Sequence, residues 1–223
     1  ALSSRDMTTS LETAAKDLVA FQTREGRMEY LARTFGDVLQ GRVLDVGCDR
    51  RYLKKLRPDL DYFGIDVGGD PDLVVNLETT PRLPFGDREF DVVVCSEVLE
   101  HLDNLHHVFG ELVRVSRKHV LISLPNCWTA ARRPVQRGKG AIGHYGLPSA
   151  RPMDRHKWFF SLSEAAEFAR AQAAEHGLSI RALRVSEKPR SPLVRALRRV
   201  AHPKRERYDN LYAHTLWVLF ERA

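Results

Sequence analysis

Short apolar runs alternate with amphipathic stretches along most of the chain. Runs of about four to eight residues rich in β-branched side chains predict strands, and stretches with apolar residues three and four positions apart predict helices. The predicted strands are Arg42–Val46, Tyr62–Asp66, Asp91–Cys95, Val120–Leu124, Ser179–Val185 and His214–Glu221. The predicted helices are Ser10–Phe35, Arg51–Leu56, Asn104–Val115 and Ser163–His176. This alternation predicts an α/β fold with a mainly parallel sheet and helices on both faces.

Two long segments interrupt the alternation. Residues 127–160 are rich in Gly, Pro, Arg and aromatic residues, and residues 189–207 are strongly basic. Loops of this length in a compact domain are usually functional or disordered, and ligands of open α/β sheets bind near the carboxyl ends of the strands. We interpret residues 1–223 as a single domain with an N-terminal helical cap over 1–35, a substrate loop over 127–160 and a basic insertion over 189–207.

The charge is local. The formal net charge is +6, and residues 189–207 alone hold seven basic residues and one acid. A second basic run lies between Arg132 and Lys139. The rest of the chain is therefore neutral overall, so we do not expect nucleic acid to be the main partner.

The remaining composition bounds the class of protein. The chain is 43% hydrophobic and 29% charged, as in ordinary globular domains. Cys48, Cys95 and Cys127 lack the spacing of a zinc site and are odd in number, so we expect reduced thiols. No apolar run approaches the ~20 residues of a membrane span, and the first residues are polar. These features predict a cytoplasmic protein.

The first candidate site follows two predicted strands. The first ends in the run Val43–Asp49, which holds Asp45 and Gly47, and Asp66 ends the second. A strand-to-helix turn can present backbone N–H groups to a carboxylate or phosphate, and an acid after the second strand can accept both ribose hydroxyls. This arrangement predicts a nucleoside cofactor.

Other nucleotide sites fit less well. A nicotinamide site would need GxGxxG, of which one glycine is present, and the acid at Asp45 would repel a pyrophosphate. The phosphate-binding pattern GxxxxGK[ST] does not occur.

Two further runs carry a family resemblance. Residues 83–102, LPFGDREFDVVVCSEVLEHL, and residues 120–126, VLISLPN, resemble the type-11 group of class I S-adenosylmethionine-dependent methyltransferases. The resemblance covers about residues 42–126. It implies a Rossmann-like sheet of seven strands, the last one antiparallel, and S-adenosylmethionine as the cofactor.

The resemblance also implies roles for single residues. Asp45 and Gly47 are expected beside the methionine part of the cofactor, and Asp66 at the ribose. The backbone carbonyl of Ser96 is expected at the cofactor amine. The whole expected cofactor set is Asp45, Gly47, Cys48, Asp49, Asp66, Val67, Asn76, Leu77, Ser96 and Glu97, with Asn76 and Leu77 at the adenine.

The chain departs from the family in its glycine-rich turn. Asp49 and Arg51 stand where later glycines are usual. Glycine relieves steric cost where φ is positive or where backbone approaches a ligand. The substitutions predict either a wider turn or direct binding of the cofactor amine by Asp49. A relative that binds the cofactor without turnover is a further alternative.

Histidines supply the candidate catalytic groups. His144 and His156 lie in the substrate loop among aromatic residues, and His144 is the expected general base, with His156 as the competitor. The resemblance implies that Glu97 and His101 flank the mouth of the cleft. We expect most of His101, His106 and His107 to be helix-surface or capping residues and assign no metal ligand. Mg²⁺ bound together with a sugar diol is left open.

The combined interpretation is an O-methyltransferase. The mixture of aromatic and polar residues in the loop favours a small-molecule or oligosaccharide acceptor, methylated on a hydroxyl. An RNA methyltransferase that uses the basic runs and a non-catalytic cofactor-binding protein are the alternatives, and a homodimer is left open.

Overall fold

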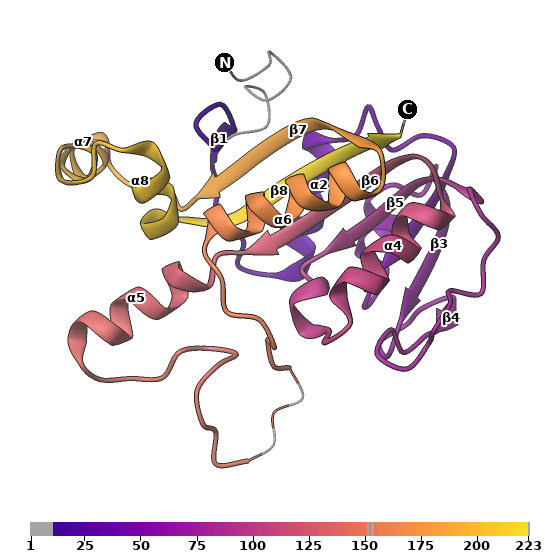
Figure 1. Cartoon of the computed structure of the whole chain (residues 1–223), viewed down its shortest axis with the longest axis horizontal. Helices are drawn as coiled ribbons and strands as arrows, with labels where there is room; N and C mark the ends of the chain where they lie inside the picture. Colours follow the sequence, from indigo (N-terminus) through magenta and orange to yellow (C-terminus); the bar gives the residue numbers. More distant parts are fainter. Residues whose placement is uncertain (1–10, 151, 153, 223) are drawn as a thin grey trace.

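One twisted sheet organises the chain. The computed structural model describes residues 11–150, 152 and 154–222 (Figure 1). Eight strands form the sheet in the order β1-β7-β8-β6-β5-β2-β3-β4. Their bounds are β1 Ala15–Leu18, β2 Arg42–Val46, β3 Asp61–Asp66, β4 Leu73–Val74, β5 Phe90–Ser96, β6 Ser116–Pro125, β7 Leu178–Glu187 and β8 Ala213–Arg222.

The expected fold class is confirmed, with one strand more than expected. β8 pairs antiparallel with both β6 and β7, and the other pairs are parallel. The sheet has eight strands because β1 and the two-residue β4 add a strand at each edge. β1 is four residues long with two charged residues, and β4 is only two residues long, so neither shows the apolar alternation that marks a strand in sequence.

Helices cover both faces. Around α4 and α6, one buried cluster includes Phe109, Leu112 and Ala169; around α2 and α3, the other includes Leu31 and Leu53. The helices are α2 Arg24–Thr34, α3 Tyr52–Leu56, α4 Leu105–Val115, α5 Cys127–Arg137, α6 Leu162–Glu175, α7 Pro192–Ala201 and α8 Arg205–Tyr212, with a 3₁₀ turn η1 at Leu99–His101. No helix among the described residues is long and apolar enough to cross a membrane.

The central strands and α6 show why the sequence pattern was informative. All residues of β5 but Asp91 are buried, as expected for a parallel strand covered on both faces. α6 begins at a capping box in which the Ser161 side chain accepts from Glu164 N–H and the Glu164 carboxylate accepts from Ser161 N–H. The predicted helix is therefore present and begins one residue earlier, at Leu162.

The N-terminal prediction was wrong in part. Ser10 and the residues before it lie outside the described residues, and the single helix predicted over Ser10–Phe35 is a strand followed by a helix. β1 pairs in parallel with β7, and Arg184 of β7 donates two hydrogen bonds to Asp17 at 2.9 Å. Pairing at the sheet edge overrides the local helical pattern, and the Thr23 side chain caps a helix that begins only at Arg24.

The two long segments are partly helical. The predicted substrate loop begins with α5, which the Asn126 side chain caps, and continues as a loop. The predicted basic insertion forms α7 and the start of α8. Figure 1 shows α5, α7 and α8 projecting from the same side of the molecule, beyond the ends of β6, β7 and β8.

Candidate functional site

The turn after β2 keeps a glycine-like backbone without the usual glycines. Gly47 has φ +80°, and a Cβ there would lie 2.2 Å from a Val98 methyl group. Asp49 and Arg51 also have left-handed backbones, with φ of 49° and 54°. Both side chains form ion pairs, Asp49 with Arg24 at 3.1 Å and Arg51 with two acids of the loop after β3. The substituted turn therefore keeps the conformation that glycines would adopt.

Asp66 joins this turn to β3. Its carboxylate accepts from the backbone N–H of Asp49 at 2.8 Å and of Val67 at 2.6 Å. An ionised carboxylate offers about four lone-pair sites, so capacity is left for hydroxyl donors.

A cleft of about 800 Å³ opens at this end of the sheet. Of the ten residues expected at the cofactor, eight line it: Gly47, Asp49, Asp66, Val67, Asn76, Leu77, Ser96 and Glu97. Arg24, Arg27, His101 and Lys157 also line it. The structure therefore brings most of the expected set to one cleft.

Asp45 and Cys48 are not among the lining residues. Asp45 is 3% exposed, and its carboxylate accepts from the Tyr62 hydroxyl at 2.8 Å. Burial raises the pKa of Asp45 to about 7. Burial and the neighbouring Asp45 raise the pKa of the Cys48 thiol to about 12. These two side chains support the turn from behind the cleft.

Glu97 separates this cleft from a second one. It has φ +52°, forms an ion pair with Arg27 and accepts from the Thr215 hydroxyl at 3.2 Å. The second cleft, of about 490 Å³, shares five lining residues with the first: Arg24, Arg27, Glu97, His101 and Asp154. Its other walls include the start of α5 and the loop residues His144, Tyr145 and His156.

Three imidazoles gather in the second cleft. The rings of His144 and His156 are stacked with centroids 4.4 Å apart, and His101 meets His156 edge-on at 4.6 Å. Asp154 lies between them, 3.2 Å from His101 Nδ1 and 3.5 Å from His144 Nδ1. The two predicted catalytic histidines are therefore in contact, and His101, expected at the mouth of the cleft, belongs to the same cluster.

The hydrogen-bond partners assign the protons of two rings. The Tyr145 hydroxyl donates to the Trp158 carbonyl at 2.7 Å, so it accepts from His156 Nδ1 at 3.0 Å. His101 Nδ1 donates to the Arg155 carbonyl at 3.1 Å. In the neutral form of a ring that donates from Nδ1, the Nε2 atom keeps its lone pair. Burial and the other two histidines lower the pKa of His156 to about 4, which keeps this ring neutral near pH 7.

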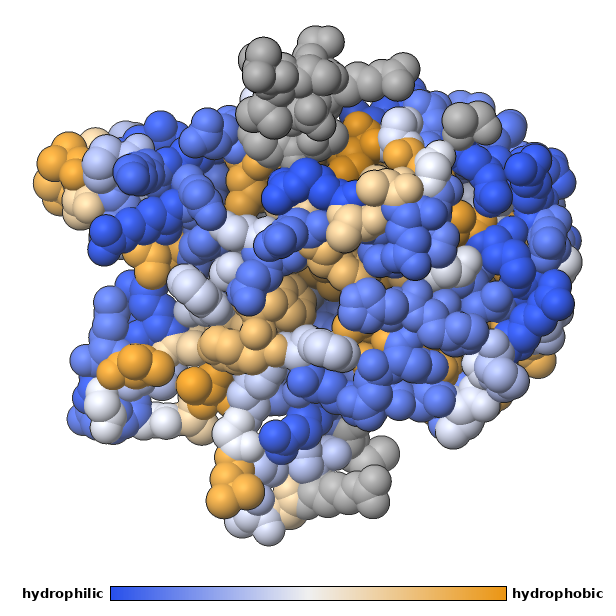
Figure 2. Space-filling view, viewed as in Figure 1, coloured by the Kyte–Doolittle hydropathy of each residue, from blue (hydrophilic) through white to orange (hydrophobic). Residues whose placement is uncertain are grey.

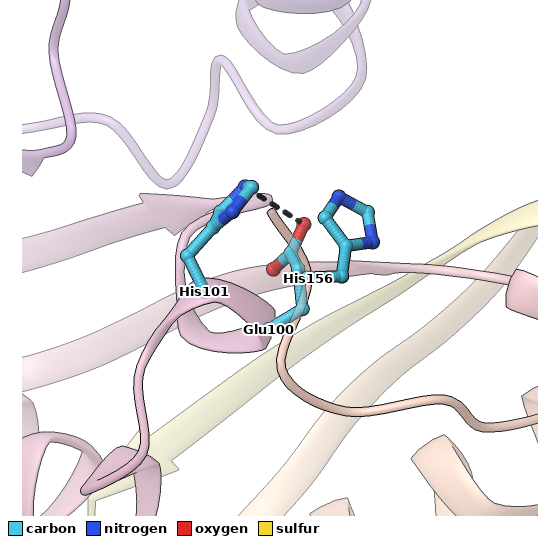
Figure 3. A group of neighbouring side chains, drawn as sticks. All are labelled: Glu100, His101 and His156. Atoms are coloured by element: carbon cyan, nitrogen blue, oxygen red, sulfur yellow. Dashed lines mark ion pairs between the residues drawn. The ribbon is translucent and has the colours of Figure 1, made fainter. Parts of the chain in front are cut away.

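Glu100 completes the cluster from below. Its side chain lies between His101 and His156 (Figure 3), 4.0 Å from His101 Nε2. It is 1% exposed, and neither carboxyl oxygen has a hydrogen-bond partner within the described residues. Burial raises its pKa well above the usual range. A buried acid without partners is costly, so this position is suited to a ligand that supplies positive charge.

Two sets of side chains could hold a metal ion. One ligand atom each from Glu100, His101 and His156 lie within 4.8 Å of one another, and so do those of His144, Asp154 and His156. No metal ligand was assigned from the sequence. The acid and histidine of the run Glu97–His101 could have suggested a metal site, because the 3₁₀ turn places Glu100 and His101 at the same cleft. Nothing in the sequence indicated that Arg27 would line both clefts.

A family profile matches most of the chain. Residues 19–178 match the family profile described as "Methyltransferase domain". The fold is similar to that of a SAM dependent methyltransferase from Archaeoglobus fulgidus, at 17% identity over 90% of this chain and 95% of that one, with a TM-score of 0.57.

Two other solved structures are similar in fold. Magnesium protoporphyrin IX methyltransferase from Synechocystis PCC 6803, with bound SAH, is 15% identical over 90% of this chain and 84% of that one, with a TM-score of 0.53. The methyltransferase domain of bacterial CtHen1-C is 18% identical over 89% of this chain and 98% of that one, with a TM-score of 0.55. Among curated proteins, no sequence matches this chain significantly.

Proposed function

The chain belongs to the methyltransferase domain family, and from this premise we propose that it methylates a hydroxyl group of a small or glycan-like acceptor. S-adenosylmethionine is the methyl donor and occupies the first cleft. The acceptor occupies the second cleft. The observation that carries the proposal is the shared wall of the two clefts, beside a cluster of three imidazoles and a buried acid.

The cofactor cleft offers a group for each part of the donor. Asp66 keeps lone pairs for the ribose hydroxyls, and Asn76 and Leu77 border the position of the adenine. The turn from Gly47 to Asp49 faces the methionine part. Glu97, at the border of the clefts, places a carboxylate near the sulfonium, where negative charge is favourable.

The reaction requires alignment and removal of one proton. The bond between sulfur and the methyl carbon breaks as the acceptor oxygen binds the methyl carbon, and the products are S-adenosylhomocysteine and a methyl ether. The hydroxyl proton passes to a base. We assign this role to His144, which is about half exposed and has Asp154 beside Nδ1 to stabilise the imidazolium. His156 is the weaker base because its pKa is low.

A divalent cation suits the three remaining groups. We propose Glu100, His101 and His156 as its ligands, because the cation would satisfy the unpartnered Glu100 carboxylate and the two Nε2 lone pairs. A bound cation makes a hydroxyl more acidic, which reduces the demand on the base. Mg²⁺, left open by the sequence, prefers oxygen ligands, whereas two imidazoles favour a transition metal.

The chemical stability of the product tests the acceptor class. Enzyme, labelled S-adenosylmethionine and pools of glycans or small hydroxyl compounds should give a labelled product that survives mild alkali, as ethers do. A product that releases methanol in alkali would be a carboxylate ester, and no base would be needed. Cofactor binding without transfer to any pool would favour the non-catalytic alternative.

The metal is tested separately. Titration of chelator-treated protein with Co²⁺ should give visible absorption bands typical of nitrogen ligation. These bands should be lost in Glu100→Gln. They should be retained in His107→Gln, which changes an exposed histidine outside both clefts. Full activity after chelation together with no Co²⁺ binding would exclude the cation but leave the hydroxyl acceptor in place.

RNA is the second candidate acceptor. The second cleft is lined by the start of α5 and by Lys188, which comes just before residues 189–207, and both segments are basic. One similar structure is a Hen1 methyltransferase domain. A ribose hydroxyl would need the same base. Tight RNA binding that weakens steeply with salt, with transfer to RNA, would favour this acceptor.

A further inference from the structure

Helix α7 exposes its apolar face and packs its basic face against the protein. Its large apolar side chains point to solvent, with Leu193 71%, Leu197 61% and Val200 81% exposed. These three residues follow the spacing of one helix face, and Val194 beside them is 38% exposed. In Figure 2 apolar surface covers the tip of the molecule formed by α7. An apolar stripe of this kind on a surface helix indicates a partner.

The inner face of α7 is fixed by arginine. The Arg198 guanidinium lies over the Tyr212 ring at 4.2 Å and is 3.7 Å from the buried Glu187 carboxylate. The Ser191 side chain caps the helix by accepting from Val194 N–H. These contacts hold α7 against α8 and the end of β7. The helix is therefore packed on the protein through its arginine side, and this packing leaves the apolar stripe exposed.

Exposed cations precede and follow the stripe along the chain. Within residues 188–207 the exposed charged side chains are five basic ones and a single acid; the basic ones are Lys188, Arg190, Arg199, Lys204 and Arg207, and the acid is Glu206. An apolar helix face with cations in the flanking segments is suited to a membrane interface. Each cation near an anionic bilayer contributes attraction that salt screens.

We propose that α7 is a docking surface for an anionic lipid bilayer, into which Leu193, Leu197 and Val200 insert. A nucleic acid would take up the cations but leave the apolar stripe in water. A second copy of the chain would place like charges together. In addition, α7 is about 15 Å long, so its single stripe is small beside the ~800 Å² that each partner of a stable protein interface buries.

The docking surface adjoins the second cleft. Lys188, just before α7, lines that cleft. Docking would therefore hold the cleft near the headgroup region and favour an acceptor that is carried on a lipid. The binding itself does not depend on the identity of the acceptor, so its test uses no activity.

Vesicle sedimentation tests the proposal. The protein should sediment with vesicles of phosphatidylcholine containing about one third phosphatidylglycerol and remain free with phosphatidylcholine alone, and binding should fall with salt. The double change Leu193→Gln and Leu197→Gln should weaken binding on the order of tenfold or more, because each leucine contributes a large favourable free energy of transfer from water into the bilayer, which glutamine lacks. Val74→Gln, a 68% exposed site on the opposite edge strand, should bind as the wild type does.

Three results would overturn the proposal. Absence of binding to anionic vesicles would do so directly. Equal binding by the double variant would mean that charge alone attracts the protein to lipid. Loss of a dimer in the double variant, measured by light scattering, would assign the stripe to a second copy. Circular dichroism and affinity for S-adenosylhomocysteine should be unchanged in every variant, which excludes unfolding as the cause.

Discussion

The two clefts share a wall but are built in different ways. Most walls of the cofactor cleft come from residues 47–102, at the ends of neighbouring parallel strands. The second cleft, proposed for the acceptor, collects residues from the N-terminal segment, η1, α5, the loop after it, the residue that follows β7 and the start of β8. The first cleft is therefore formed mostly by one continuous part of the sequence, whereas the second depends on contacts between distant segments. Mutations should separate the two.

The largest effect is expected at the acceptor cleft. His144→Gln removes the proposed base and should lower kcat by about 10²–10⁴-fold. Affinity for S-adenosylhomocysteine, measured by calorimetry, should not change, because His144 does not line the cofactor cleft. His107→Gln, outside both clefts, is the control. Near-normal kcat in His144→Gln, with collapse in His156→Gln, would transfer the role to His156.

The next effect concerns the support behind the cofactor cleft. Burial raises the pKa of Asp45 from an ordinary 3.8 to about 7, so the folded state holds the proton more tightly than the unfolded state. Stability should therefore fall as pH rises from 3.8 to about 7, by at most about 4 kcal/mol. Asp45→Asn keeps an acceptor for Tyr62 and should flatten this decline.

Urea unfolding of both proteins across this pH range measures the difference. Asp45→Asn should bind S-adenosylhomocysteine nearly as the wild type does, because Asp45 does not line the cleft. Parallel pH dependences in the two proteins would mean that Asp45 ionises normally. A sharp loss of affinity would instead favour direct contact with the cofactor, as the sequence resemblance implies.

Asp66 lies on the cleft surface, and its change should act on affinity. Asp66→Asn removes a charged acceptor for the ribose, a loss of about 1.5–3 kcal/mol, or roughly 10- to 150-fold in Kd. Asp61→Asn, exposed at the other end of β3, is the matched control. Calorimetry should show the loss only in Asp66→Asn; unchanged affinity, or a preference for NAD, would contradict the assignment of the cleft.

The same contrast explains what the sequence could predict. β2 has the predicted bounds, and the other predicted strands are present with ends that differ by a few residues. These strands could be predicted because their apolar runs alone mark them as buried, whatever segments pack against them. β1 was missed because it exists only through pairing with β7. Arg27 was missed for a similar reason: its contact with Glu97 joins residues 70 positions apart. The acid at Glu100 could be read from the sequence, but its burial beside two imidazoles could not, because that burial depends on the loop that carries His156.

The smallest effect is expected at Arg51, where the family uses glycine. Its left-handed backbone costs a residue with a Cβ about 1–2 kcal/mol, while its exposed ion pairs with Asp70 and Asp72 contribute little. Arg51→Ala removes the ion pairs and keeps the strain, and Arg51→Gly removes both. The glycine variant should therefore be more stable than the alanine variant by about 1 kcal/mol in urea unfolding. Because the turn already has the glycine conformation, Arg51→Gly should change affinity for S-adenosylhomocysteine by less than about threefold. A large gain in affinity would show that the substituted turn impairs binding, and would support a chain that holds its cofactor poorly.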